Sequence, residues 1–192
     1  MSSSLLLLLG IAESVLLYFV LVVAAIGFTL PLKQWKKALQ QLGVVPKKIS
    51  EFSISRTFKE AVFLLVLVFF LLTFEALLLS VAHVNDAEKV AGVIQKLSVI
   101  AMLVAVTIAP FAEEVFFRGF LQKKVGVILT ALLFSALHFS FGSTTELVGA
   151  FTAALVFGWW VKYKNPSLWP VILAHAGYNA ISVLLVVGTG MN

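Results

Sequence analysis

Long apolar runs separated by short polar breaks dominate the sequence. Six of these runs approach the length needed for a membrane helix, because a bilayer core requires about 20 mainly apolar helical residues. They cover residues 5–30, 61–82, 97–121, 125–141, 146–161 and 169–189. The runs are continuous and do not alternate with a period of two, which argues against a membrane β-barrel. The sequence therefore predicts an all-α bundle of about six transmembrane helices.

Composition supports a protein embedded in the lipid bilayer. Hydrophobic residues make up 61% of the chain and charged residues 12%. We expect one transmembrane domain over residues 1–192. The net charge of +5 does not indicate a nucleic-acid partner, because the basic residues lie in loops, where they set topology. Cysteine is absent, which excludes disulfides, thiolate zinc sites and a cysteine nucleophile. No pattern specifies an oligomeric state.

Basic residues gather in the connections on one side of the predicted bundle. Segment 31–59 carries Lys33, Lys36, Lys37, Lys47, Lys48, Arg56 and Lys59. Two later connections add Lys123, Lys124, Lys162 and Lys164. Because cytoplasmic loops are enriched in Lys and Arg, we expect this side to face the cytosol of a cell-membrane protein, with both termini outside. The loop around Asp86 and the short turn 142–146 are then expected on the opposite side.

Segment 31–59 is predicted to be a basic cytosolic loop at the membrane interface, and its stretch 33–48 has two interpretations. Basic residues alternate there with Trp35, Leu39 and Leu42, which is typical of an amphipathic segment lying at the headgroups. The stretch is equally compatible with a solvated loop that serves only as a topology signal. The sequence leaves both interpretations open.

Three ionisable residues stand close together inside one apolar run. Each such group costs about 2.5–3.5 kcal/mol at the centre of a membrane helix, so each requires an explanation. Glu114 and Arg118 are four residues apart and can form an ion pair on one helix face. Glu113 points about 100° away, which makes it the candidate base, while Glu114 stays ionised and structural. The alternative is a buried ion-pair cluster that only fixes helix packing.

Two histidines and an asparagine lie in later apolar runs. His138 follows Phe134 by four residues, and His175 and Asn179 share a helix face through the same spacing. If runs 97–121 and 125–141 form a hairpin, the glutamates and His138 lie about 15–21 Å below the turn. His175 and Asn179 lie about 9 and 15 Å from the same side. We therefore expect a conical polar cavity open to the cytosolic side.

The chemistry of this set fits peptide hydrolysis. The reaction requires a base for water, a group that orients the water and donors for the oxyanion. Glu113, the two histidines and Asn179 supply these parts. Alternatively, Glu113, His138 and His175 could bind Zn²⁺ with water at the open position. A transporter is less favoured, because paired broken helices are absent from the sequence pattern.

Two further glutamates, Glu13 and Glu75, also lie in apolar runs. Neither belongs to the motifs above. For Glu75 we favour an interhelical hydrogen bond over an accessory proton-binding role, because polar side chains in membrane helices commonly bond across helices. Asp86 lies in a polar loop, so the chain offers no intramembrane aspartyl pair.

The three motifs together resemble a known family. Glu-Glu-x-x-x-Arg at Glu113 to Arg118, Phe-x-x-x-His at Phe134 and His138, and His-x-x-x-Asn at His175 and Asn179 are similar to those of CAAX protease and bacteriocin-processing proteins. They occupy residues 110–179, the predicted catalytic region. The resemblance implies an all-helical intramembrane endopeptidase related to the type II CAAX prenyl endopeptidase. That enzyme removes the last three residues of prenylated proteins from the cytosolic side.

The resemblance also implies roles for the motif residues. Glu113 activates water with help from His138, while His175 and Asn179 stabilise the oxyanion, without a required metal. The implied partner is a peptide or a prenylated protein, cleaved near its C-terminus. Some members of this family are linked to bacteriocin self-immunity, so the alternative function is a non-catalytic membrane scaffold or immunity protein.

Overall fold

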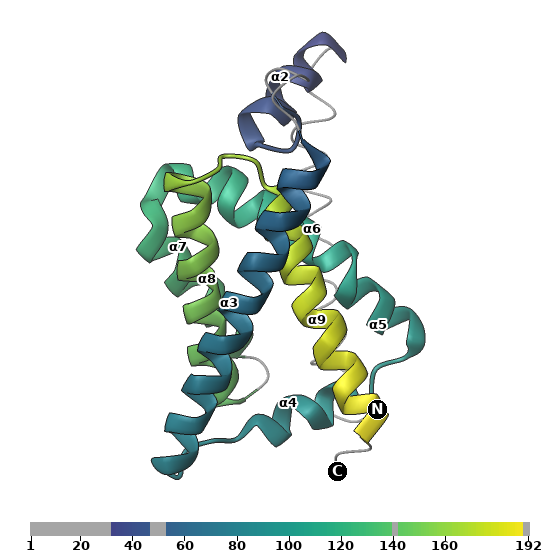
Figure 1. Cartoon of the computed structure of the whole chain (residues 1–192), viewed down its shortest axis with the longest axis vertical. Helices are drawn as coiled ribbons and strands as arrows, with labels where there is room; N and C mark the ends of the chain where they lie inside the picture. The colour runs from purple at the N-terminus through teal and green to yellow at the C-terminus, as the bar shows by residue number, and fades with distance from the viewer. Residues whose placement is uncertain (1–31, 47–52, 140–141, 190–192) are drawn as a thin grey trace.

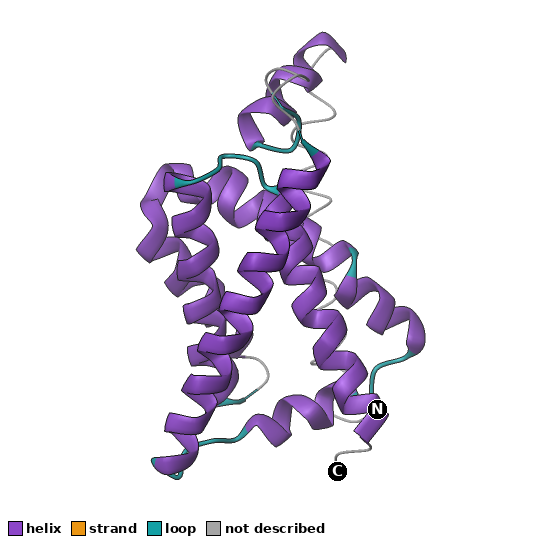
Figure 2. Cartoon of the chain, viewed as in Figure 1, coloured by secondary structure: helices purple, strands orange, loops and turns teal. Residues whose placement is uncertain are grey.

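The computed structural model describes residues 32–46, 53–139 and 142–189, and these residues fold entirely into helices and their connections (Figure 2). In chain order the helices are α2 (Leu32–Leu42), α3 (Ile54–Val81), α4 (Ala87–Ile94), α5 (Val99–Val106), α6 (Ile108–Glu114), the π-helix η2 (Val115–Leu121), α7 (Gln122–His138), α8 (Thr144–Tyr163) and α9 (Trp169–Thr189). Helix α2 lies at one end of the bundle and α4 at the other (Figure 1).

Four helical stretches among the described residues are long and apolar enough to cross a membrane. They are Ile54–Val81, Val99–His138, Thr144–Tyr163 and Trp169–Thr189. Five of the six predicted runs fall within these stretches or overlap them closely. The sixth, residues 5–30, lies outside the described residues, as does Glu13. The protein is thus a multi-pass membrane protein, as the apolar runs predicted.

The stretch Val99–His138 contains two of the predicted segments and reverses its direction. A straight helix of 40 residues would be about 60 Å long, twice the thickness of a bilayer core. Gly126 interrupts it with φ 84° and ψ 174°, a conformation that glycine adopts without steric cost. Phe117 and Phe134, on either side of this break, have ring centroids only 5.0 Å apart. The hairpin predicted to turn near Lys124 is therefore present.

Helix α2 forms within the segment predicted to be a basic loop, and the chain after it is held against the bundle. The Gly43 carbonyl accepts from the Leu168 N–H at 3.0 Å, and the Val44 carbonyl accepts from the Trp169 indole at 2.9 Å. Leu42 is buried, whereas Lys36 is exposed. These contacts favour the amphipathic interpretation. Location at lipid headgroups stays a prediction.

The same contacts place three basic connections at one end of the bundle. Lys123, which follows η2, donates to the Gln41 carbonyl in the last turn of α2, and the α8–α9 connection bonds to Gly43. The predicted grouping of these loops on one side is therefore correct. Their exposure to the cytosol, and a cavity that opens there, stay predictions.

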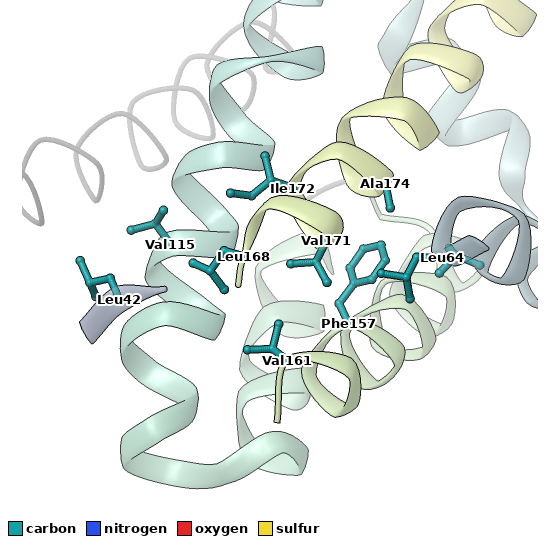
Figure 3. Packing of buried hydrophobic residues seen from close by; sticks show 10 residues of the cluster. Leu42, Leu64, Val115, Phe157, Val161, Leu168, Val171, Ile172 and Ala174 are labelled. Atoms are coloured by element: carbon teal, nitrogen blue, oxygen red, sulfur yellow. The ribbon is translucent and has the colours of Figure 1, made fainter. Parts of the chain in front are cut away.

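The bundle packs around an apolar core to which five helical elements contribute. Leu64 of α3, Val115 of η2, Phe157 of α8 and Val171 of α9 converge in this core (Figure 3). The outward faces are also apolar, as Phe70 and Leu184 illustrate with exposed fractions of 66% and 70%. A surface of this kind suits lipid, because the bilayer interior solvates hydrocarbon and not polar groups. Inside the bundle, the Thr152 hydroxyl donates to Glu75 at 2.7 Å, the interhelical bond expected for this glutamate.

The connection around Asp86 was predicted to be a polar loop, but it contains the helix α4. Asp86, which precedes α4, uses its carboxylate to cap the start of α8 and not the start of α4. Its carboxylate accepts from the Thr144 N–H at 3.0 Å, the Thr145 N–H at 2.9 Å and the Ser143 hydroxyl at 2.8 Å. Unsatisfied N–H groups at a helix start require such acceptors. The connection that contains α4 and the connection before α8 therefore lie side by side.

Asp86 makes folding stability depend on pH. The Thr145 N–H, with the Thr144 N–H and the Lys89 ammonium, holds the pKa of the Asp86 carboxyl well below its usual range. A carboxyl with a depressed folded-state pKa stabilises the fold above its unfolded-state pKa of about 3.9, and this contribution is lost as pH falls through the folded-state value. Stability contributed by Asp86 is therefore complete at neutral pH and declines in acid.

Replacement of Asp86 tests this cap. Asp86→Ala is expected to lower the free energy of unfolding at neutral pH by about 0.5–2 kcal/mol, the usual cost of losing a helix cap. Urea unfolding in detergent, repeated at about pH 3, should give a smaller difference from the wild type, because Asp86 in the unfolded wild-type chain then takes up a proton and favours unfolding. Glu88→Ala, an exposed acid two residues away, is the control. An equal loss in both variants contradicts the assignment.

Candidate active site

A buried ion pair forms the base of the site. Glu114 ends α6, and Arg118 follows it in η2 with its Nη1 atom 3.1 Å from Glu114 Oε1. Both side chains are buried, with exposed fractions of 0% and 1%. The four-residue spacing thus produces the predicted pair, although the chain here is a π-helix. Short π-helical segments are frequent at functional sites, because the extra residue per turn shifts side chains out of the regular helical register.

Aromatic rings surround the positive charge of Arg118. Its guanidinium carbon lies 4.5 Å from the ring centroid of Phe134, with Phe157 at 5.8 Å and Phe117 at 6.0 Å. The flat guanidinium suits ring faces, which attract cations. Within the described part of the chain, its nitrogens make no well-aligned hydrogen bond. Glu114 and the three aromatic rings therefore stabilise the buried positive charge of Arg118.

His175 of α9 lies between the two neighbouring glutamates. Its Nδ1 atom is 2.9 Å from Glu114 Oε1, and its Nε2 atom is 3.8 Å from Glu113 Oε2. An ionised carboxylate only accepts hydrogen bonds, so Nδ1 is the donor toward Glu114. Glu113 retains an exposed fraction of 15%, whereas Glu114 has none. The predicted pairing of Glu114 with Arg118 is present, while the role of Glu113 as the base stays a prediction.

His138 ends α7 and stands over the ring of Phe134. The ring centroids are 4.5 Å apart, and His138 Nδ1 lies 2.9 Å from the Phe134 carbonyl oxygen. Because a carbonyl accepts only, Nδ1 carries the proton in this contact. The Phe134 ring also contacts His175, with centroids 6.1 Å apart. The phenylalanine of the second motif thus supports both histidines and Arg118.

Asn179 lies one helical turn beyond His175, and its amide nitrogen donates to the Ala105 carbonyl of α5 at 2.9 Å. The chain kinks at Thr107, between α5 and α6, shortly before Pro110. This bond directs the amide nitrogen toward α5 and ties α9 to the kink that leads to Glu113. The predicted contribution of Asn179 to an oxyanion site stays a prediction.

One acidic residue was missed by the analysis of the sequence. Glu146 was assigned to a turn on the side opposite the active site, yet it is the third residue of α8 and interacts electrostatically with His138, His175 and Glu113. The short α7–α8 connection was a usable signal, because it places the first turn of α8 beside the last turn of α7. The cluster therefore draws on α6, α7, α8 and α9.

The zinc alternative named Glu113, His138 and His175 as ligands. Among the described residues, no three histidine, aspartate or glutamate side chains are arranged so that they could hold a metal ion. The Nδ1 atom of His175 is already bonded to Glu114. In this arrangement the three side chains form no metal site, and zinc binding by them stays a prediction.

Comparison with known proteins finds a family to which the motif region is similar. The family model described as "Type II CAAX prenyl endopeptidase Rce1-like" matches residues 95–181. An uncharacterized protein of Mycoplasma capricolum subsp. capricolum is 30% identical over 111 residues, which are 53% of this chain and 32% of that protein. This chain thus matches about a third of that relative's length. No solved structure gives a significant match. The matched residues 95–181 contain every motif residue, so this similarity covers the same region as the resemblance seen in the three motifs.

Proposed function

We propose that this protein is an intramembrane endopeptidase that hydrolyses a peptide bond near the C-terminus of a membrane-associated substrate, with prenylated CAAX-type peptides as the substrate class. The observation that carries the proposal is the position of His175. It lies 2.9 Å from a buried, Arg-paired glutamate and 3.8 Å from a second glutamate that remains accessible. Charged groups inside membrane helices are costly, and a cluster with separate roles supports chemistry.

The accessible carboxylate and His138 activate water in this mechanism. Glu113 orients the water molecule, and His138 Nε2 accepts a proton as the water oxygen attacks the peptide carbonyl carbon. The bond from oxygen to carbon forms first, and the carbon–nitrogen bond then breaks. The proton passes from His138 to the leaving amine nitrogen. Glu113 and His138 are therefore the catalytic residues.

The remaining motif residues stabilise the negative charge on the carbonyl oxygen. Glu114 holds the Nδ1 side of His175, and when the opposite nitrogen carries a proton its Nε2–H can donate to the oxyanion. The Asn179 amide has two hydrogens, and only one is required for its bond to Ala105. Arg118 pairs with Glu114, and Glu114 in turn fixes the ring orientation of His175.

Cleavage by the wild-type protein tests the proposal. Purified protein in lipid vesicles is expected to release a C-terminal tripeptide from a farnesylated CAAX peptide, detected by mass spectrometry. The same peptide without the lipid should be cleaved much more slowly, because it does not partition into the membrane. Activity should persist after treatment with a zinc chelator, since no step uses a metal. Failure to cleave either peptide by folded protein contradicts the proposal and favours a non-catalytic membrane role.

A further inference from the structure

Glu146 extends the site from a fourth helix. It lies eight residues after His138, across the short connection between α7 and α8. Of its electrostatic interactions with ionisable neighbours, the one with His138 is the strongest, followed by those with His175 and Glu113. The carboxylate is only partly exposed. A carboxylate in such surroundings loses much of its hydration, so a nearby positive charge is its main source of stabilisation.

Hydrogen bonds on both sides fix the position of Glu146. The Ser143 hydroxyl accepts from the Glu146 N–H at 3.1 Å and donates to Asp86 at 2.8 Å. One residue further on, the Leu147 carbonyl accepts from the Ser135 hydroxyl of α7 at 2.6 Å. Ser135 is three residues before His138, so this bond joins the two helices beside the histidine. The first turn of α8 is thus anchored against the last turn of α7.

Helix capping alone does not account for this residue. Ser143 and Glu146 have the spacing of a capping box, in which the glutamate side chain would bond back to the N–H of the serine. Only half of the box is present, because Ser143 accepts from the Glu146 N–H. Among the described residues, the Glu146 carboxylate has no hydrogen bond to Ser143, and its interactions are with the charges of the site.

We propose, building on the peptidase function above, that Glu146 is a positioning residue whose negative charge stabilises the protonated His138 ring between its two proton transfers. His138 gains a proton from the attacking water and loses it to the leaving amine, and Glu146 exchanges no proton in the cycle. The role is that of an acid that supports a catalytic histidine by its charge. It requires Glu146 to remain ionised during turnover.

Other ionisable groups face this pair from every neighbouring helix. Glu113 approaches from α6, and His175 and Tyr178 approach from α9. Glu75 of α3 interacts with Tyr178, and Lys89 of α4 bonds to Asp86. Arg118 of η2 is paired with Glu114. Several carboxylates remain around His138 when one of them is removed. Removal of Glu146 should therefore make the protonated His138 ring less stable and leave the other contacts of the site in place.

Glu146→Gln tests the proposal, with Glu75→Gln as a control that removes a nearby membrane-embedded carboxylate whose hydrogen bond is to Thr152. Glutamine is compatible with a capping box, so the fold should be retained, and thermal unfolding verifies this.

We expect kcat for the farnesylated peptide to fall about 100-fold with little change in KM, the size typical of a lost contribution to proton transfer. The acidic limb of the pH–rate profile should move to lower pH. Glu146→Asp should restore part of the activity, and Glu75→Gln should retain it.

Nitrogen NMR of histidine-labelled protein separates this inference from the proposed function. The chain has three histidines, so the signals can be assigned by substitution. In Glu146→Gln, the His138 signals should move toward those of the neutral ring at unchanged pH, while Glu75→Gln should leave them in place.

Unchanged His138 signals in Glu146→Gln overturn the inference whether or not the wild type cleaves peptide. Wild-type activity retained in full by Glu146→Gln also overturns it, with the peptidase function intact. If the wild type cleaves no peptide, the peptidase function is overturned, and the positioning role of Glu146 in catalysis is overturned with it.

Discussion

Glu113→Gln is expected to lower kcat for peptide cleavage by about 10²- to 10⁴-fold, the range for loss of a group that activates the nucleophile. Glutamine has nearly the same shape, but its neutral amide is a far weaker acceptor for water. The fold should survive, because Glu113 is partly exposed and its nearest charged partner, His175 Nε2, is 3.8 Å away. Single-turnover cleavage of the farnesylated peptide, measured beside thermal unfolding, separates lost chemistry from lost structure.

The control for this variant is Glu88→Gln. Glu88 is an exposed acid on α4 that is absent from the described site, so its neutralisation should leave the cleavage rate near that of the wild type. Wild-type activity in Glu113→Gln contradicts the role of Glu113 as the residue that orients water. A variant that is both inactive and unfolded points instead to a structural role for this glutamate.

Arg118→Met is expected to cost about 3–5 kcal/mol of unfolding free energy, because it leaves the Glu114 carboxylate buried without its cation. Urea unfolding in detergent, followed by tryptophan fluorescence, measures this loss. The chain provides a matched control in Arg56→Met. Arg56 pairs with Glu60 at the same four-residue spacing, at 2.7 Å, but its side chain is 65% exposed. An exposed pair of this kind contributes at most about 1 kcal/mol.

A double variant tests whether the pair serves stability or the site. In Glu114→Met with Arg118→Met, neither charge remains buried, so much of the stability lost in Arg118→Met should return. Cleavage should stay lost, because His175 Nδ1 no longer has the carboxylate that it contacts at 2.9 Å. Equal stability of the single Arg118→Met variant and the wild type contradicts the assignment of a buried, paired charge.

The membrane-spanning helices could be predicted from the sequence, because the bilayer restricts the structures that can cross it. A chain in a bilayer must satisfy its backbone hydrogen bonds internally, so long apolar runs become helices. The run at 169–189 coincides with α9 for this reason. Helix α4 could not be found in the same way, because its eight residues form no long apolar run. Its place depends on Asp86, whose partners in α8 are 57 to 59 residues away in the sequence.

The site was predictable where it depends on spacing within one helix, as with Glu114 and Arg118. The site was not predictable where a side chain bonds to a residue on another helix. Asn179 was grouped with His175 by spacing, yet its amide nitrogen donates to a carbonyl near the kink at Thr107. Glu146 was assigned to a turn because the apolar run appeared to begin at that residue. Helix α8 starts two residues earlier, at Thr144, and this places the carboxylate beside the histidines.

The pairing of Glu114 with Arg118 also bears on how the protein enters the membrane during synthesis. Both charges belong to consecutive turns of one segment, so they can neutralise each other as soon as that segment is helical. The segment then carries one uncompensated charge, on Glu113, into the hydrocarbon region instead of three. Separate charges would each add about 2.5–3.5 kcal/mol to the insertion cost. The hairpin of α6, η2 and α7 can therefore integrate before α9 has been translated, and His175 joins a carboxylate that is already in place.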